Sequence, residues 1–191
     1  SPGTFRGKKQ AQALDKFLAK IPFDIFVSSD SERAYQTLYP LWKRRGRQGV
    51  MPVDSRLAET SIFPVAGVPG KMAKVIFDPE NFFERYPEAV TTLQLDSLAG
   101  MMGDLREFSQ DLLNSPSIKG KTVAIGAHGG SILALLMAFG QISVKKYTAV
   151  RGFADFSQNV GINVVAYLPE KKQWKLLVAK DDSYLPKNLK R

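Results

Sequence analysis

The segment from Thr122 to Leu136 constrains the fold of this chain more than any other. Thr122 to Ala127 is almost entirely apolar and rich in β-favouring residues, which is typical of a strand covered on both faces. Two glycines follow, and they allow a tight turn without the steric cost of a Cβ atom. Ser131 comes next and is expected to cap a helix rich in leucine. The segment therefore predicts a buried strand, a sharp turn and a helix.

His128 lies at the point where this strand is expected to end, and it is the only histidine in 191 residues. In open α/β sheets, ligands bind outside the carboxyl ends of the strands, beside helix N-termini that favour anions. A lone histidine at a loop edge can also simply bond to the backbone. The arrangement of strand, histidine, two glycines and helix favours a functional histidine.

The rest of the chain alternates between helical and strand patterns. Helices are expected at 4–19, 32–45, 78–86 and 93–113, strands at 23–29, 145–150, 161–167 and 174–179, and irregular segments at 51–74 and 153–159. The last two strands are expected to form a hairpin, and residues from about 181 onward have the composition of a basic polar tail. This alternation predicts a single α/β domain over residues 1–191, with a mostly parallel sheet flanked by helices.

Helical spacing predicts which residues of the helices face the core. In the first helix these are Ala11, Leu14, Phe17 and Leu18; in the second, Ala34, Leu38 and Leu41; in the 93–113 helix, Leu95, Leu98, Met101, Met102, Leu105, Phe108 and Leu112.

The strand expected at 23–29 ends in Ser28-Ser29-Asp30-Ser31, which offers hydroxyl and carboxylate caps for the second helix. Arg33 and Glu59 are the other candidate functional residues. Arg33 falls in the first turn of the second helix, where a cation opposes the helix dipole. It should therefore have an anionic partner, which is either a protein carboxylate or a bound ligand. Glu59 is the most prominent carboxylate of the 51–74 segment, and irregular segments of this length tend to be functional or mobile.

Composition excludes several kinds of site. The chain has no cysteine, so disulfides and thiolate metal sites are ruled out, and a single histidine argues against zinc. We expect neither a metal nor a cofactor. No stretch approaches the roughly 20 apolar residues of a membrane span. The start of the chain has no secretory pattern, so an intracellular or organellar soluble protein is favoured over a secreted one.

The net charge is +9 and the pI about 9.7. A solvated basic surface explains such a charge, and a phosphorylated ligand, nucleic acid or an anionic membrane surface are the functional alternatives. The basic run from Trp42 to Gln48 is interpreted as an exposed helix end, with nucleic-acid contact as the alternative.

Several segments together resemble the histidine phosphatase superfamily, which has the phosphoglycerate mutase-like fold. Thr4 to Leu14 is similar to a T-x-x-G-x-x-Q-A-x-x-L helix start, and Val27 to Thr37 to an S-S-x-x-x-R-A-x-Q-T segment. Arg56-Leu57-x-Glu59 follows at a suitable distance. Ala127 to Ser131 resembles the second histidine motif, and Asn159 to Ile162 suits the closing segment. The motifs occur in the family's order, and the resemblance covers about residues 4–178.

The resemblance implies a three-layer α/β fold with a phosphate pocket. Arg33 would bind phosphate oxygens with its guanidinium fork. His128 would donate a charge-assisted hydrogen bond to the same phosphoryl group. Glu59 would be the general acid that protonates the leaving oxygen.

One motif of the family is missing from this sequence. The family opens with a strand that ends in Arg-His-Gly, and that histidine is the nucleophile that accepts the phosphoryl group. No histidine precedes Gly7, and Thr60 to Phe63 also lacks the Gly and Trp-Glu-Gly pattern usual after the glutamate. As written, this chain is not expected to catalyse by the family mechanism.

Three interpretations of the missing motif remain open. The chain could be an N-terminally trimmed active phosphatase. It could be a degenerate member that serves as a structural subunit, with an anionic partner or with a protein partner that completes the sheet by strand addition. It could also be a non-catalytic binder of phosphate or phosphomonoesters, because Arg33 and His128 are retained.

Overall fold

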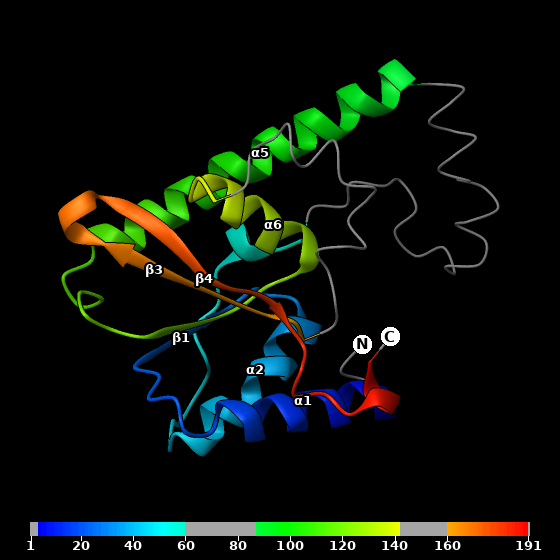
Figure 1. The fold of residues 1–191 in the computed structure, drawn as a ribbon, viewed down its shortest axis with the longest axis vertical. Helices are drawn as coiled ribbons and strands as arrows, with labels where there is room; N and C mark the ends of the chain where they lie inside the picture. The colour runs from blue at the N-terminus through cyan, green and yellow to red at the C-terminus, as the bar shows by residue number, and fades with distance from the viewer. Residues whose placement is uncertain (1–3, 60–86, 142–159, 191) are drawn as a thin grey trace.

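The computed structural model of the chain describes residues 4–59, 87–141 and 160–190, and the side chains of 87–99 are outside this description. Its α-helices are α1 (Phe5–Leu18), α2 (Glu32–Arg44), α5 (Pro87–Asn114) and α6 (Gly129–Ala138), and its short 3-10 helices are η1 (Ser55–Leu57), η3 (Pro169–Lys171) and η4 (Lys187–Leu189). Its strands are β1 (Ile25–Ser28), β2 (Val123–Gly126), β3 (Ile162–Leu168) and β4 (Gln173–Asp181) (Figure 1).

The described strands form one parallel pair and one antiparallel hairpin. β1 pairs with β2 in parallel, from Ile25 opposite Val123 to Ser28 opposite Gly126. Val53 adds a single parallel bridge on the other side of Ser28. β3 and β4 form an antiparallel hairpin. Parallel β1 and β2 end at the same edge, so the residues after Ser28 and Gly126 lie near one another.

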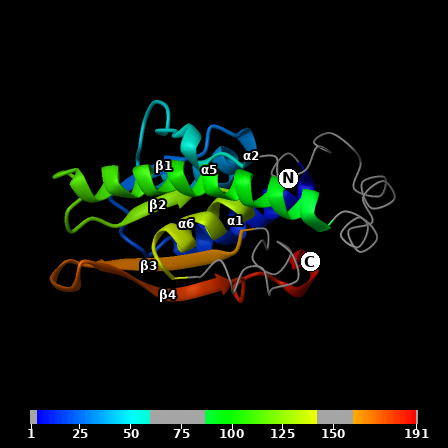
Figure 2. The same cartoon turned by 90° about the horizontal axis from the view of Figure 1, so that it is seen from above.

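Two apolar clusters cover the strands from opposite sides. One cluster contains residues of α5 and α6, including Leu105 and Leu133, and Ile125 of β2 packs against it. The other contains residues of α1 and α2, including Leu41, together with Ala124 of β2. The strands therefore lie between two layers of helices, as Figures 1 and 2 show. The α/β fold expected from the sequence is confirmed.

The helices follow their predicted boundaries closely. Thr4 caps α1, where its side-chain oxygen accepts the Gly7 N–H at 3.1 Å. α5 is longer than expected and starts at Pro87, which suits a first helical position because proline has no N–H to satisfy. The helix expected at 78–86, the strand at 145–150 and the loop at 153–159 lie outside the described residues. The predicted core residues Ala34, Leu38 and Leu41 are buried.

Two expectations about α1 and the chain end are wrong. Phe17 does not face the core. Its ring stacks on Tyr184 at 4.7 Å between centroids, and 47% of the residue remains exposed. The predicted polar tail is in part a packed segment: β4 extends to Asp181, and Leu185 and Leu189 beyond it are buried. A side chain's burial here depends on a segment more than 160 residues away, which helical periodicity does not reveal.

The basic run at the end of α2 has structural contacts. Arg44 donates from Nε and from its terminal nitrogen to the Asp15 carboxylate at 2.7 and 2.6 Å. Arg45 and Arg47 donate to backbone carbonyls in 19–24. The run therefore ties α2 to α1 and to the start of β1, which agrees with the interpretation as a helix end. None of the helices in the described ranges is long and apolar enough to cross a membrane.

Candidate functional site

Arg33, Glu59 and His128 come together at the carboxyl end of the parallel strands. Arg33 Nε donates to His128 Nδ1 at 3.0 Å, and a terminal nitrogen of the same guanidinium donates to the Glu59 carboxylate. The Glu59 carboxylate oxygen lies 3.8 Å from His128 Nδ1. Three residues that are far apart in the sequence thus form one cluster, and the anionic partner expected for Arg33 is Glu59 in this structure.

Arg33 is positioned by the turn between β1 and α2. Ser31 occupies the N-cap position, but its side chain makes no capping bond. The Ser29 hydroxyl instead accepts the Ser31 N–H at 3.2 Å and fixes the turn. Ser28, Ser29, Asp30 and Ser31 were expected to offer caps for this helix, but the N-cap residue Ser31 makes no side-chain cap and Ser29 bonds to the turn before the helix. Arg33 then points from the first turn of α2 toward the end of β2.

Glu59 is positioned by a segment that follows β1. The amide of Asp54 donates to the Ser28 carbonyl at 2.8 Å, which holds this segment against the strand. Leu57 is fully buried in the cluster formed with α5 and α6. With Leu57 anchored, Glu59 emerges two residues later at the surface, where 38% of its side chain is exposed.

Arg56 has a structural contact pattern. It donates to Asp54 and, at 2.7 Å, to Asp111 of α5, and its guanidinium lies 5.5 Å from the centre of the Phe108 ring. Its hydrogen bonds to Asp54 and Asp111 raise the pKa of Arg56 and keep it charged. The segment Arg56-Leu57-x-Glu59 therefore combines two anchoring residues with one candidate site residue.

His128 is the buried member of the cluster, with 7% of the residue exposed. It occupies the N-cap position of α6, which Ser131 was expected to take. Ser131 lies three positions later and its hydroxyl accepts the His128 backbone N–H at 2.9 Å. The N-cap was expected three positions too late. The helix starts at Gly129, directly after His128, and not after Ser131. His128 is consequently held by both its backbone and its ring.

Burial and the hydrogen bond from Arg33 both favour the neutral form of the His128 ring. Burial lowers its pKa from the ordinary value of 6.5, the Arg33 guanidinium lowers it further, and Glu59 and Asp30 act in the opposite direction. Because Nδ1 accepts a hydrogen bond from Arg33, the proton of the neutral ring is on Nε2. Nε2 then donates to the Ser29 hydroxyl at 3.0 Å.

Ser29 is a site residue that sequence reasoning assigned only to helix capping. It is fully buried, and its oxygen contacts the His128 ring and the turn before α2. A serine beside a histidine can act as a nucleophile, but here the histidine nitrogen facing Ser29 carries a proton and accepts none. Ser29 therefore orients His128. Its position after β1, next to the residue after β2, was the available signal.

The cluster is open to solvent on the side of Arg33, whose side chain is 51% exposed. An anion that approached from that side would meet the guanidinium and could replace Glu59 on it. Across the residues that the structure describes, no group of three histidine, aspartate or glutamate side chains is placed to hold a metal ion. The chemistry available from these residues is anion binding and proton transfer.

Comparison with known proteins identifies the fold family. The model of the histidine phosphatase superfamily (branch 1) matches residues 4–180. A mycobacterial glucosyl-3-phosphoglycerate phosphatase solved with VO3 is 26% identical, with a TM-score of 0.72 over 93% of this chain and 85% of that chain. No curated protein matches the chain.

More distant structures share the fold. A phosphoserine phosphatase mutant from Entamoeba histolytica in complex with phosphoserine is 18% identical, with a TM-score of 0.64 over 96% of this chain and 86% of that chain. A phosphoglycerate mutase from Bacillus anthracis is 16% identical, with a TM-score of 0.62 over 96% of this chain and 84% of that chain. The family match spans most of the sequence, and the chain belongs to the histidine phosphatase superfamily.

Proposed function

We propose that this chain binds the phosphoryl group of phosphomonoesters at the cluster of Arg33, Glu59 and His128. The observation that carries the proposal is the convergence of these side chains at the carboxyl end of β2, in a chain that belongs to the histidine phosphatase superfamily. The relatives solved with VO3 and with phosphoserine support a phosphorylated ligand.

Binding would exchange one anion for another on Arg33. In the free protein the guanidinium is neutralised by Glu59, and half of its side chain is exposed. A phosphoryl group offers more acceptor oxygens than a carboxylate and can take both arms of the guanidinium fork. A phosphoryl group that draws Arg33 away from His128 would also free Nδ1 of the ring to accept a proton. The negative charge of the phosphoryl group would raise the affinity of the His128 ring for that proton.

Glu59 would lie beside the bound phosphoryl group. Its carboxylate is 3.8 Å from His128 Nδ1, within the region that a phosphoryl group on Arg33 would occupy. In a member of the family that turns over its substrate, a carboxyl group at this position would protonate the leaving alcohol as a general acid.

The chain as written is proposed to bind without turnover. It has one histidine, whose ring already contacts Arg33 and Ser29. The family mechanism needs a second histidine as nucleophile, so one imidazole would have to serve both roles. Incubation with p-nitrophenyl phosphate should release no p-nitrophenol above the rate of the Glu59→Gln variant. Turnover that Glu59→Gln abolishes would contradict this part of the proposal.

Orthovanadate binding, measured by isothermal titration calorimetry, tests the pocket. Arg33→Ala and His128→Ala should each weaken binding by about 1.5–3 kcal/mol, the range for hydrogen bonds to charged groups. Arg106→Ala is the matched control, because Arg106 is an exposed arginine of α5 outside the cluster. Unchanged affinity in both site variants, or an equal loss in the control, would refute the pocket.

A second candidate function is that of a structural subunit whose sheet a partner strand completes. Ile125 of β2 and Val165 of β3 pack against the same cluster on one face, and Ala124 and Ile162 share the cluster on the other. The two strand pairs therefore lie in one layer, yet within the described ranges β2 is paired with β1 and β3 with β4. A strand added along β2 would supply hydrogen-bond partners to that edge.

The two candidates differ in their dependence on another chain. Size-exclusion chromatography with light scattering, followed by native mass spectrometry, should find the subunit in a stable complex. Its net charge of +9 favours an anionic partner. A monodisperse and stable monomer that binds vanadate would support the phosphate-binding proposal and count against the structural one.

A further inference from the structure

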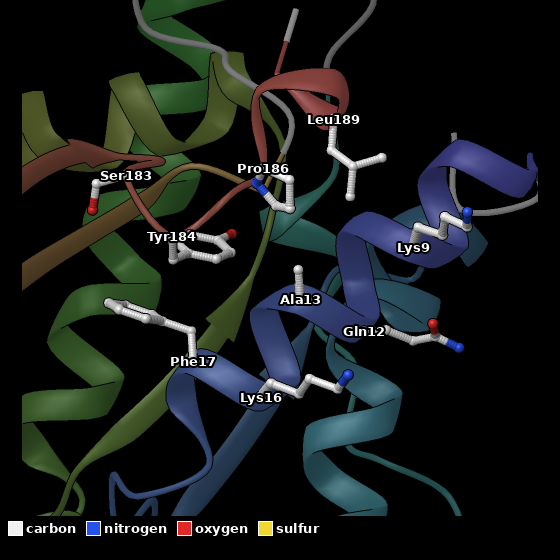
Figure 3. Close-up of a pocket in the computed structure, with 9 residues that line it drawn as sticks. All are labelled: Lys9, Gln12, Ala13, Lys16, Phe17, Ser183, Tyr184, Pro186 and Leu189. Carbon is white, nitrogen blue, oxygen red and sulfur yellow. The ribbon is translucent and has the colours of Figure 1, made fainter.

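An open groove lies between α1 and the segment that follows β4, and it contains no residue of the phosphate cluster (Figure 3). Its volume is about 740 Å³. Lys9, Ala13, Lys16 and Phe17 line it from α1, and Tyr184 and Leu189 line it from the other side. The groove joins two parts of the chain that the sequence analysis treated as a helix face and a tail.

The wall opposite α1 is held in place by several contacts. The buried side-chain amide of Gln10 donates to the Leu189 carbonyl at 2.8 Å. Arg6 donates to the Lys190 carbonyl at the end of the described chain. Leu185 and Leu189, both in the segment after β4, are buried. These contacts make the groove a preformed feature of the folded protein.

The floor of the groove is apolar. Phe17 and Tyr184 stack face to face, and Phe17 remains 47% exposed. The Tyr184 hydroxyl donates to the Val160 carbonyl, and burial raises the pKa of Tyr184, so it presents a neutral ring to the groove. A half-exposed phenylalanine next to a second aromatic ring is a surface that an apolar partner side chain can cover.

The rim of the groove on α1 is basic. Lys9 and Lys16 are exposed and lie seven residues apart, a rise of about 10 Å or two helical turns. The acidic residue of α1, Asp15, is neutralised by Arg44 and is not part of the groove. An apolar floor beside two ammonium groups is complementary to an apolar surface flanked by carboxylates.

We propose that this groove binds an acidic amphipathic helix of a partner protein. An apolar side chain of that helix would lie over Ala13 and Phe17, and carboxylates two turns apart would pair with Lys9 and Lys16. A helix fits this spacing because it repeats its side chains with the same rise as α1. A small ligand fits less well, since small-molecule sites bury most of the ligand whereas most of the side chains lining this groove are exposed.

The test uses a fluorescein-labelled helical peptide with leucines along one face and two glutamates seven residues apart beside them. Binding to the protein is followed by fluorescence anisotropy, with a second peptide carrying glutamine in place of both glutamates. The acidic peptide should bind saturably, and the glutamine peptide about tenfold more weakly, since two exposed ion pairs contribute a few tenths to about 1 kcal/mol each. Equal binding of both peptides would overturn the charge argument.

Protein variants locate the binding. The double variant Lys9→Glu/Lys16→Glu should weaken binding of the acidic peptide by about tenfold or more. It removes both ion pairs and adds repulsion between glutamates of the protein and of the peptide. Lys8→Glu with Lys20→Glu makes the same change of charge on exposed lysines outside the groove and should have less than about a threefold effect. Circular dichroism melting confirms that each variant is folded.

Two further outcomes would overturn the proposal. Equal losses in the two double variants would show non-specific attraction to a basic surface. Saturable binding to vesicles of anionic lipid, abolished by the Lys9/Lys16 variant while the acidic peptide does not bind, would assign the groove to a lipid surface. Arg33→Ala serves as a further control and should leave peptide binding unchanged, because Arg33 lies outside the groove.

Discussion

Gly126 lies where α2 packs most closely on β2, and adding one methyl group there should disturb both stability and the phosphate cluster. A Cβ atom on Gly126 would lie 2.9 Å from Cδ1 and 3.0 Å from Cγ of Leu38, and 3.1 Å from the Ser28 hydroxyl. Cγ is the branch point of the leucine, so rotation of the side-chain end does not remove the overlap. Either Leu38 must leave its χ1 rotamer or α2 must shift, and α2 carries Arg33 in its first turn.

The size of the effect follows from two opposing contributions. Overpacking a core with one methyl group costs about 1–3 kcal/mol. Replacing glycine in a strand by alanine recovers about 0.5–1 kcal/mol of backbone entropy. Gly126→Ala should therefore lower the free energy of unfolding by about 1–2 kcal/mol. For a domain of this size that corresponds to a decrease in Tm of roughly 2–8 °C.

A double-mutant cycle tests the cause. Leu38→Ala alone should cost about 2–5 kcal/mol because it leaves a cavity. In the Leu38→Ala background the overlap with Leu38 is gone and only the 3.1 Å contact with the Ser28 hydroxyl remains, so Gly126→Ala should cost much less there. Urea denaturation gives the free energies, and vanadate titration should show weaker binding in the Gly126→Ala single variant. Additive effects, or a Gly126→Ala protein as stable and as tightly binding as the parent, would refute the reasoning.

Three further predictions concern the cluster and its supports. As pH falls from about 7 to 5, the free energy of unfolding should decrease, because burial lowers the pKa of His128 below the ordinary 6.5 and the unfolded chain then binds the proton more readily. Urea denaturation at several pH values should show a weaker pH dependence of this free energy for His128→Gln. No pH dependence in the parent protein would contradict this. Ser29→Ala should lower the free energy of unfolding by about 1–3 kcal/mol, because it leaves the imidazole N–H of His128 unpaired. Ser28→Ala should have almost no effect, because the Ser28 hydroxyl is buried without a hydrogen-bond partner among the described residues. Equal effects of the two variants in thermal melts would contradict this. Leu57→Ala should cost about 2–5 kcal/mol and weaken vanadate binding, because Leu57 anchors the segment that carries Glu59. Leu14→Ala removes a buried leucine of α1 in the other apolar cluster and should weaken vanadate binding less. Calorimetry showing equal affinity in the two variants would contradict this.

Local pattern in the sequence predicted the elements near the site well. The strand before His128, the helix after it and the helix that begins near Arg33 were all expected, because apolar periodicity and glycine chemistry are local properties. The start of α6 was misplaced, since either glycine could begin the helix and only the packed structure selects the first. The residues around Glu59 gave no indication of its neighbours, and only the family resemblance grouped it with Arg33 and His128.

Contacts across the fold decided what local pattern left open. Ser29 was expected to cap a helix and also orients His128, because parallel β1 and β2 bring their ends together. Phe17 belongs to an apolar face by spacing, yet its burial depends on how far Tyr184 covers it. These residues are distant in sequence, so no window along the chain contains both partners.

The sequence by itself determined the α/β class, the candidate residues Arg33, Glu59 and His128, and the absence of any thiolate site. These depend on composition, on periodicity and on the order of motifs, which a linear chain carries in full. The tertiary structure decided that Arg33 is paired with Glu59, that His128 accepts from Arg33 at Nδ1 and faces Ser29 with Nε2, and that α1 and the chain end form a basic apolar groove. Each of these depends on distance and burial, which exist only once separate segments pack together.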